Sequence, residues 1–341
     1  MIKPNYFAAE KAARNFLYNF NISSLPVPLE IYFKAFPDLR IASYSWYANK
    51  HDIDIDEVIT HTDSDSGCCW YIPEMKKYMI LYNDTISNPG HIRWTIAHEL
   101  GHYALKHNEK TNRSIIARSS LTKSEYDAFE KEANCFARTL LAPPYVLHGL
   151  KKFDARDISE WCNISMAAAI NILKFFNKGL ELGRNFNPLD DIAQLFSRYI
   201  YEKNNERQCT NCNHYFISPT GKFCPVCCNK RLLKRRGVNW MIYDGYILNE
   251  DHLPITCPQC ENEQITGNFC KICGVGLLNK CTNVEYDNYG ESIIWECGAI
   301  AEGNARYCIQ CGHPTTYLKQ GLLKPWNEVK QEIRLSIDLP F

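Results

Sequence analysis

The chain has 341 residues, about twice the usual size of one domain, and its 38 basic and 38 acidic side chains give a formal net charge of zero. A neutral chain is not expected to bind nucleic acid or acidic membranes over its whole surface, although a local patch is compatible with this total. Hydrophobic residues make up 45% of the chain, which excludes wholesale disorder, and no apolar run has the length of a membrane span.

The N-terminal half predicts a mixture of helices and short strands. Charged residues interrupt the apolar positions of the first 20 residues, which indicates an amphipathic helix and not an export signal. We therefore expect a cytoplasmic protein. The expected elements are helices over residues 5–20 and 29–36 and strands over 39–47, 68–72 and 78–82.

A long helix follows the last of these strands. Asn88 provides a helix N-cap and Pro89 suits the first helical position, so the helix should run from Pro89 to about His107. Its residues 98–102 read HELGH, which is an H-E-x-x-H pattern.

A second long helix has equally clear signals. Thr122 and Glu125 fit a capping box, and a proline pair ends the helix near Ala142. Residues 155–176 then predict two short helices, separated by the turn at 163–165.

The H-E-x-x-H pattern predicts a catalytic zinc site. His98 and His102 lie one turn apart on the same helix face, so both imidazoles can reach one metal ion. Glu99 lies about 100° round the helix from His98, beside the metal and not on it. A carboxylate in that position can take a proton from an attacking water and pass it to a leaving amine.

A catalytic zinc needs a third protein ligand, and the next helix offers two glutamates. Glu130 and Asn134 share one flank of the apolar stripe, whereas Glu132 points to the other flank. We prefer Glu130 as the ligand and expect Asn134 to support a zinc histidine through a hydrogen bond. Glu132 stays open as an alternative ligand, and its ordinary interpretation is a solvated helix carboxylate.

Other polar residues in this half carry weaker signals. We expect His107 to be a helix-end residue that caps carbonyl groups. Tyr126 or Tyr145 is a candidate for stabilising an oxyanion, although tyrosine is usually an amphipathic residue at the edge of a core. Cys68 and Cys69 have no partner at ligand spacing, so we assign them no role.

The two motifs together are recognisable. Residues 93–102 read RWTIAHELGH and residues 130–143 read EKEANCFARTLLAP. They resemble the ImmA/IrrE family of zinc metallopeptidases, whose pattern is r-x-T-x-A-H-E-x-G-H followed by E-x-x-A-N-x-F-A-x-x-L-L-M-P. Ala142 stands where the family usually has Met. Residues 157–173 also resemble the short helical segment that follows the peptidase core, so the resemblance covers roughly residues 1–180.

The resemblance implies an α+β, gluzincin-like fold with a small antiparallel sheet over the active-site helix. It also implies cleavage of a protein substrate, often a helix-turn-helix transcriptional repressor. By motif position, His98, His102 and Glu130 become the zinc ligands and Glu99 becomes the catalytic base. The strand at 78–82 could hold an extended substrate along its edge.

Cysteine distribution marks the C-terminal half. The chain has 17 cysteines, of which 13 fall between Cys209 and Cys311. Without an export signal these thiols are expected to be reduced, so metal sites are favoured over a disulfide scaffold. The polar stretch at 198–207 is a plausible hinge before this half, which is poor in aliphatic residues and would need metal to fold.

The cysteine spacing predicts three zinc ribbons. The first two have paired C-x-x-C knuckles, and the third requires a hairpin inserted within its first half. Four thiolates close each site, so these zincs should be structural. Cys228 is a spare thiol. The ligand sets are Cys209, Cys212, Cys224 and Cys227; Cys257, Cys260, Cys270 and Cys273; and Cys281, Cys297, Cys308 and Cys311.

A basic cluster surrounds the second knuckle of the first ribbon. It favours nucleic-acid contact, but lysines near a four-thiolate site also offset its net charge of −2. Residues 239–300 hold nine acidic and only two basic side chains, so docking of a protein is at least as well supported. The cluster consists of Lys222, Lys230, Arg231, Lys234, Arg235 and Arg236.

These patterns predict an intracellular zinc endopeptidase with zinc ribbons for recognition, sensing or docking, one catalytic and about three structural zincs, and no membrane partner. The alternative is a non-catalytic regulator in which the ribbons hold nucleic acid. The expected parts are a metallopeptidase domain (1–150), a helical extension and linker (151–205), zinc ribbons at 206–238, 253–279 and 280–318, and a tail (319–341).

Overall fold

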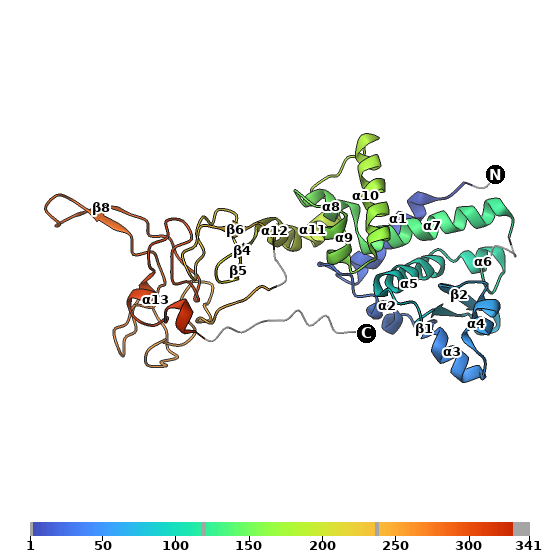
Figure 1. Cartoon of the computed structure of the whole chain (residues 1–341), viewed down its shortest axis with the longest axis horizontal. Coiled ribbons are helices and arrows are strands. Elements are labelled where there is room, and N and C mark those ends of the chain that lie inside the picture. The colour runs from blue at the N-terminus through green and yellow to red at the C-terminus, as the bar shows by residue number, and fades with distance from the viewer. Residues whose placement is uncertain (1–2, 117–120, 236–238, 330–341) are drawn as a thin grey trace. The chain divides into compact units, whose positions relative to one another are not determined.

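The computed structural model describes residues 3–116, 121–235 and 239–329, and the chain divides into two compact units at Tyr201 and Glu202 (Figure 1). Over the described residues, thirteen α-helices and three small sheets give a mixed α+β structure, as predicted. No described helix is both long enough and apolar enough to cross a membrane.

Helices dominate the N-terminal unit. Most begin at a side-chain cap that the sequence shows, such as Asn88, which accepts from the His91 N–H, and the capping box of Thr122 and Glu125. The helices are α1 (Tyr6–Asn19), α2 (Glu30–Ala35), α3 (Tyr44–His51), α4 (Ile55–Thr62), α5 (Pro89–Ala104), α6 (His107–Thr111), α7 (Lys123–Leu141), α8 (Pro144–Gly149), α9 (Ala155–Cys162), α10 (Met166–Glu181), α11 (Asp191–Leu195) and α12 (Ser197–Asn205), with a 3-10 turn at Pro73–Met75.

The sheet of this unit has three strands, β1 (Leu39–Ser43), β2 (Gly67–Ile72) and β3 (Lys77–Tyr82), in the order β1-β3-β2. β2 pairs antiparallel with β3, but β1 pairs parallel with it, so the expected purely antiparallel sheet is wrong for one strand. A parallel neighbour needs a crossover connection, and here α3, α4 and β2 supply it. β1 is also shorter than expected, because Ser43 caps α3 by accepting from the Trp46 N–H.

Close contact between α5 and α7 organises the core of this unit (Figure 1). Gly101 lies at the crossing, where an added Cβ would come within 3.1 Å of the Ala133 Cα and 3.2 Å of the Phe136 Cβ. A larger residue would require the neighbouring helix to shift by a few tenths of an ångström, so glycine favours this close approach. The buried Arg93 fixes the other side of α5, because its guanidinium donates to the carbonyl oxygens of Cys162 and Val27.

α5 ends at Ala104, earlier than predicted. Lys106 adopts a left-handed conformation (φ 56°), which turns the chain and starts α6 at His107. The division between the two units falls inside the stretch 198–207 that the sequence predicted as the boundary, and α12 and the start of β4 occupy this stretch. Phe196 and Tyr199 are buried in the core of the N-terminal unit, and this burial favours an ordered helix there.

The C-terminal unit consists mainly of turns and short strands. Its ribbons are in contact: the Arg306 and Tyr307 N–H groups both donate to the Pro225 carbonyl, and the Phe223 N–H donates to the Ile309 carbonyl. The first and third ribbons therefore share one hydrogen-bonded body. The elements are β4 (Glu206–Cys209), β5 (Tyr215–Ile217), β6 (Leu232–Leu233), β7 (Val284–Tyr286), β8 (Ile293–Glu296), α13 (Thr316–Lys319) and a 3-10 turn at Trp326–Glu328.

Candidate metal centre and active site

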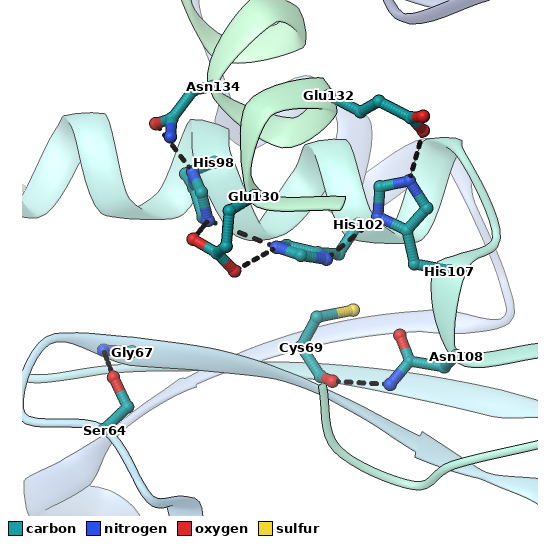
Figure 2. Close-up of polar contacts among 10 residues, drawn as sticks. All are labelled: Ser64, Gly67, Cys69, His98, His102, His107, Asn108, Glu130, Glu132 and Asn134. Carbon is teal, nitrogen blue, oxygen red and sulfur yellow. Dashed lines mark hydrogen bonds and ion pairs between the residues drawn. The ribbon is translucent and has the colours of Figure 1, made fainter. Parts of the chain in front are cut away.

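The predicted ligands of the N-terminal unit converge between α5 and α7 (Figure 2). The Nε2 atoms of His98 and His102 lie 3.1 Å apart, and the carboxylate oxygens of Glu130 lie 3.3 Å and 3.4 Å from them. Ligands bound tetrahedrally at zinc–ligand distances near 2.05 Å would be about 3.3 Å apart. Two imidazoles and one carboxylate at this spacing fit a zinc ion and leave a fourth position open.

Asn134 holds His98 from the side away from this cluster. Its Oδ1 lies 3.1 Å from the His98 Nδ1 and accepts the ring N–H. With the proton on Nδ1, the lone pair of Nε2 faces His102 and Glu130. The structure thus places Asn134 one turn after Glu130 on α7, in the supporting position expected for it.

A second series of hydrogen bonds supports His102, and it was not predicted from the sequence. His107 Nε2 donates to Glu132 Oε2 at 2.9 Å, and the Asn5 N–H donates to Glu132 Oε1 at 2.7 Å. With that proton on Nε2, the His107 Nδ1 is an acceptor, and it receives the His102 Nδ1–H at 3.0 Å. The His102 Nε2 lone pair is thereby directed at the cluster.

The hydrogen bonds from His102 through His107 to Glu132 correct two expectations from the sequence. Glu132 is neither a solvated carboxylate nor a member of the metal cluster, because it is buried and bonded to His107. His107 is fully buried and does not cap a helix end with its side chain. The left-handed turn at Lys106 aims His107 inward, and lysine gives no sequence signal for such a turn.

Protonation in this cluster follows from burial and from charge. Burial lowers the pKa of His102 to about 4, so its ring is neutral, as a metal ligand must be. Burial opposes ionisation of Glu130, but hydrogen bonds from His102 and His98 overcome it and hold the pKa of Glu130 well below its usual value. Burial would lower the pKa of His98, yet Glu130 and Glu99 raise it to about 9 in the metal-free cluster. A bound zinc ion would have to displace that proton from His98, so metal binding should release it.

Glu99 lies beside the cluster, on the wall of a cavity of about 210 Å³ that the three ligands also line. Only 8% of its surface is exposed, and burial raises the pKa of Glu99 to about 7 despite the opposing influence of His98. A backbone hydrogen bond from Cys69 also acts against this rise. A carboxyl group with a pKa near neutrality is suited to accept and return a proton.

Residues 48–173 match the family model of the IrrE N-terminal-like domain, Peptidase_M78. This segment includes α5 and α7 and therefore the whole cluster. The match confirms the ImmA/IrrE-type resemblance for this part of the chain and supports a function of the zinc metallopeptidase type. A search of curated proteins gave no match.

The wall of the IrrE-like cavity includes other residues considered from the sequence. Tyr126 lines the cavity, whereas Tyr145 packs under Arg14, with its ring centre 4.9 Å from the guanidinium carbon. Of these two tyrosines, Tyr126 is the one that lines the cavity. Cys68 and Cys69 also line the cavity, and burial raises the pKa of both thiols well above the usual value, so they stay protonated.

A second hollow continues from the cavity along α7. It has a volume of about 390 Å³ and shares His91 and Trp94 with the first. Arg138 lines it and lies over the Phe175 ring, 4.1 Å from its centre. Because Glu130, Asn134 and Arg138 are spaced four residues apart, they share one face of α7, over about 12 Å of helix from first to last.

The C-terminal unit brings the three predicted cysteine sets together. In the first, sulfur–sulfur distances are 3.4 Å for Cys209–Cys227 and 3.6 Å for Cys212–Cys224. The nearest pairs in the other two sets lie at 3.3 to 3.9 Å. Four thiolates bound tetrahedrally at 2.3 Å would be about 3.8 Å apart, so each set is compatible with zinc.

The spare cysteine and the basic cluster lie close to these sites. Cys228 belongs to none of the three sets, and its Sγ donates to the Gly312 carbonyl at 3.0 Å. Arg236 lies outside the described residues. The other five side chains of the basic cluster are exposed in ribbon 1: Lys222, Lys230, Arg231, Lys234 and Arg235.

Proposed function

We propose that this protein is a zinc-dependent endopeptidase that cleaves a specific protein. The observation that carries the proposal is the convergence of His98, His102 and Glu130 beside the buried Glu99, in one cavity of the IrrE-like segment. Two histidines and a glutamate with an open fourth position are the ligand set of catalytic zinc sites in peptidases.

Zinc, when bound there, would supply Lewis-acid polarisation of the scissile carbonyl group and of water. Glu99 removes the proton of the attacking water and returns it to the leaving amine. Asn134 and His107 orient the two histidine rings, so that the lone pairs of both Nε2 atoms face inward. Tyr126 lies on the same cavity wall and is our candidate for a donor to the developing oxyanion.

The direct test is Glu99→Gln, which keeps the size of the side chain and removes its basicity. We expect cleavage of the protein substrate to fall by about 10³-fold, with the zinc content unchanged. A matched control is Glu160→Gln on the exposed side of α9, which should cleave normally. Undiminished cleavage by the Glu99 variant would contradict the proposal.

The sheet does not offer the free strand edge that was expected to bind the substrate. β3 is the central strand of the sheet, so its edges are already paired and the strand at 78–82 cannot receive a substrate. β2 borders the cavity, but three of its backbone groups are engaged. The Gly67 N–H donates to Ser64 Oγ, and the Cys69 carbonyl accepts from Asn108 (Figure 2). The Tyr71 N–H donates to the Ser114 carbonyl.

We therefore place the substrate along the hollow beside α7. An extended peptide rises about 3.3 Å per residue, so the 12 Å between Glu130 and Arg138 corresponds to about four substrate residues. The positive charge of Arg138, about 12 Å along the helix from Glu130, favours a substrate with an acidic residue at the matching position. The stacked Phe175 ring pre-orders the Arg138 guanidinium for such a contact.

For the identity of the substrate, the family resemblance supports a helix-turn-helix repressor. Co-expression with a candidate repressor should give fragments only when Glu99 is intact. The C-terminal unit then supplies docking or sensing and not chemistry, because each cysteine set offers four ligands and leaves no open metal position. Persistence of the biological effect in Glu99→Gln would instead support the non-catalytic regulator.

A further inference from the structure

The β7–β8 hairpin lies between Cys281 and Cys297, where the third ribbon was expected to carry an insertion. It exposes an unusual concentration of large apolar side chains. None of them belongs to a core cluster of the described residues. The exposed fractions are 53% for Tyr286, 88% for Tyr289, 55% for Ile293, 66% for Ile294 and 47% for Trp295.

The hairpin is ordered by its own backbone and not by these side chains. Its strands pair in antiparallel register, with Glu285 opposite Trp295. Asp287 organises the tip, where its carboxylate accepts from the N–H groups of Tyr289, Glu291 and Ser292 at 2.9 to 3.1 Å. A two-stranded hairpin gains little stability alone, so large apolar side chains that stay exposed outside every core cluster of the described residues are better explained by a partner.

Charge identifies the kind of partner. Residues 282–305 contain five acidic side chains and no Lys, Arg or His. Four of the five are on the hairpin, namely Glu285, Asp287, Glu291 and Glu296. Such a surface repels nucleic-acid phosphates and the hairpin of a second copy, and it attracts cationic groups.

We propose that the β7–β8 hairpin is a docking surface for a protein partner whose contact surface is basic and apolar. Tyr289 and Trp295 are the main anchors that become buried, because Tyr and Trp contribute most to the binding free energy of interfaces, and the exposed Ile294 adds apolar area beside Trp295. The surrounding carboxylates accelerate association and select against acidic partners. This docking does not depend on peptidase activity, so it can be measured with Glu99→Gln protein.

The experiment uses the full-length, zinc-loaded chain and a defined probe, an amphipathic helical peptide of leucine and lysine, with its leucine–glutamate counterpart. We expect binding of the lysine peptide only, with an affinity that falls as salt rises. Replacing Tyr289, Ile294 and Trp295 by serine should weaken binding at least tenfold. Neutralising the acidic groups with Glu285→Gln, Glu291→Gln and Glu296→Gln should weaken it similarly and flatten the salt dependence.

The matched control removes three exposed acidic groups elsewhere in the same unit, with Glu250→Gln, Asp251→Asn and Glu263→Gln. This variant should bind like the parent protein. Equal losses in the control and hairpin variants, or no loss in either, would overturn the proposal. So would hairpin-dependent binding of duplex DNA, or self-association that disappears in the hairpin variants. If the triple serine variant loses zinc, Tyr289→Ser alone, at the exposed tip, repeats the test.

Discussion

The two units hold their metal-binding residues in opposite ways. In the N-terminal unit, two long helices from a large apolar core place three ligands, and further buried residues orient them. In the C-terminal unit, short knuckles carry the ligands, and the cysteines themselves make up much of each small core. The first unit thus places its candidate ligands on an apolar core, whereas in the second unit we expect bound metal to stabilise the fold itself.

The largest effect that this comparison predicts is the loss of a structural zinc. Cys224 is completely buried in the small core of the first ribbon, and Cys224→Ser should unfold this ribbon, because structural zinc contributes about 10 kcal/mol or more to folding. The N-terminal unit should keep its helices. Hydrogen exchange resolved by residue measures both, and equal loss of protection in α5 and α7 would show that the units do not differ as described.

A smaller effect is expected where α5 crosses α7. Gly101→Ala places a Cβ 3.1 Å from the Ala133 Cα, which forces the helices apart at a cost of about 1–3 kcal/mol and moves Glu130 away from the histidines. Thermal unfolding and zinc titration measure the two consequences. The control is Gly179→Ala in α10, where a Cβ meets no atom closer than 3.6 Å. That change should stabilise the protein by up to about 1 kcal/mol.

Replacing His107, whose Nδ1 accepts the His102 N–H, tests whether this hydrogen bond contributes to zinc affinity. His107→Phe keeps a ring against Phe129 but leaves the His102 Nδ1–H without an acceptor. Affinity for the catalytic zinc should fall about 10–100-fold, with the cysteine sites unaffected. His148→Phe serves as control, since this exposed ring stacks on Phe186 away from the cluster. Unchanged zinc affinity would reduce the His107–Glu132 pair to a packing role.

The smallest effect is expected for Arg138, on the face of α7 that also carries Glu130 and Asn134. Arg138→Gln should lower kcat/KM for the protein substrate about tenfold, through the loss of one charged hydrogen bond, without changing zinc content. Arg138→Lys should restore part of the rate. If substrate binding beside α7 is wrong, both variants will cleave like the parent protein.

The sequence predicted those parts of the fold that local signals determine. Asn88 and the Thr122–Glu125 box placed the starts of α5 and α7, and the spacing of cysteines identified the three sets that the structure brings together. The parallel pairing of β1 could not be predicted, because it depends on a crossover through distant elements.

The hydrogen bonds that orient His102 could not be predicted from the sequence either. The hydrogen bond of His107 to Glu132 spans 25 residues of sequence, and that of Asn5 to Glu132 spans 127. The His107 contact depends on a left-handed turn at Lys106, a residue type that does not signal one. The preference for Glu130 over Glu132 rested on helix geometry, and the structure places Glu130 in the cluster and Glu132 behind it.

Zinc stoichiometry tests the central claim most directly, namely that one chain combines a catalytic site in a stable fold with three sites that create a fold. Metal analysis of the purified chain should give four zincs, and Glu130→Ala should give three with the far-ultraviolet circular dichroism spectrum unchanged. Three zincs in the parent protein, with none lost in Glu130→Ala, would contradict a metal centre at His98, His102 and Glu130.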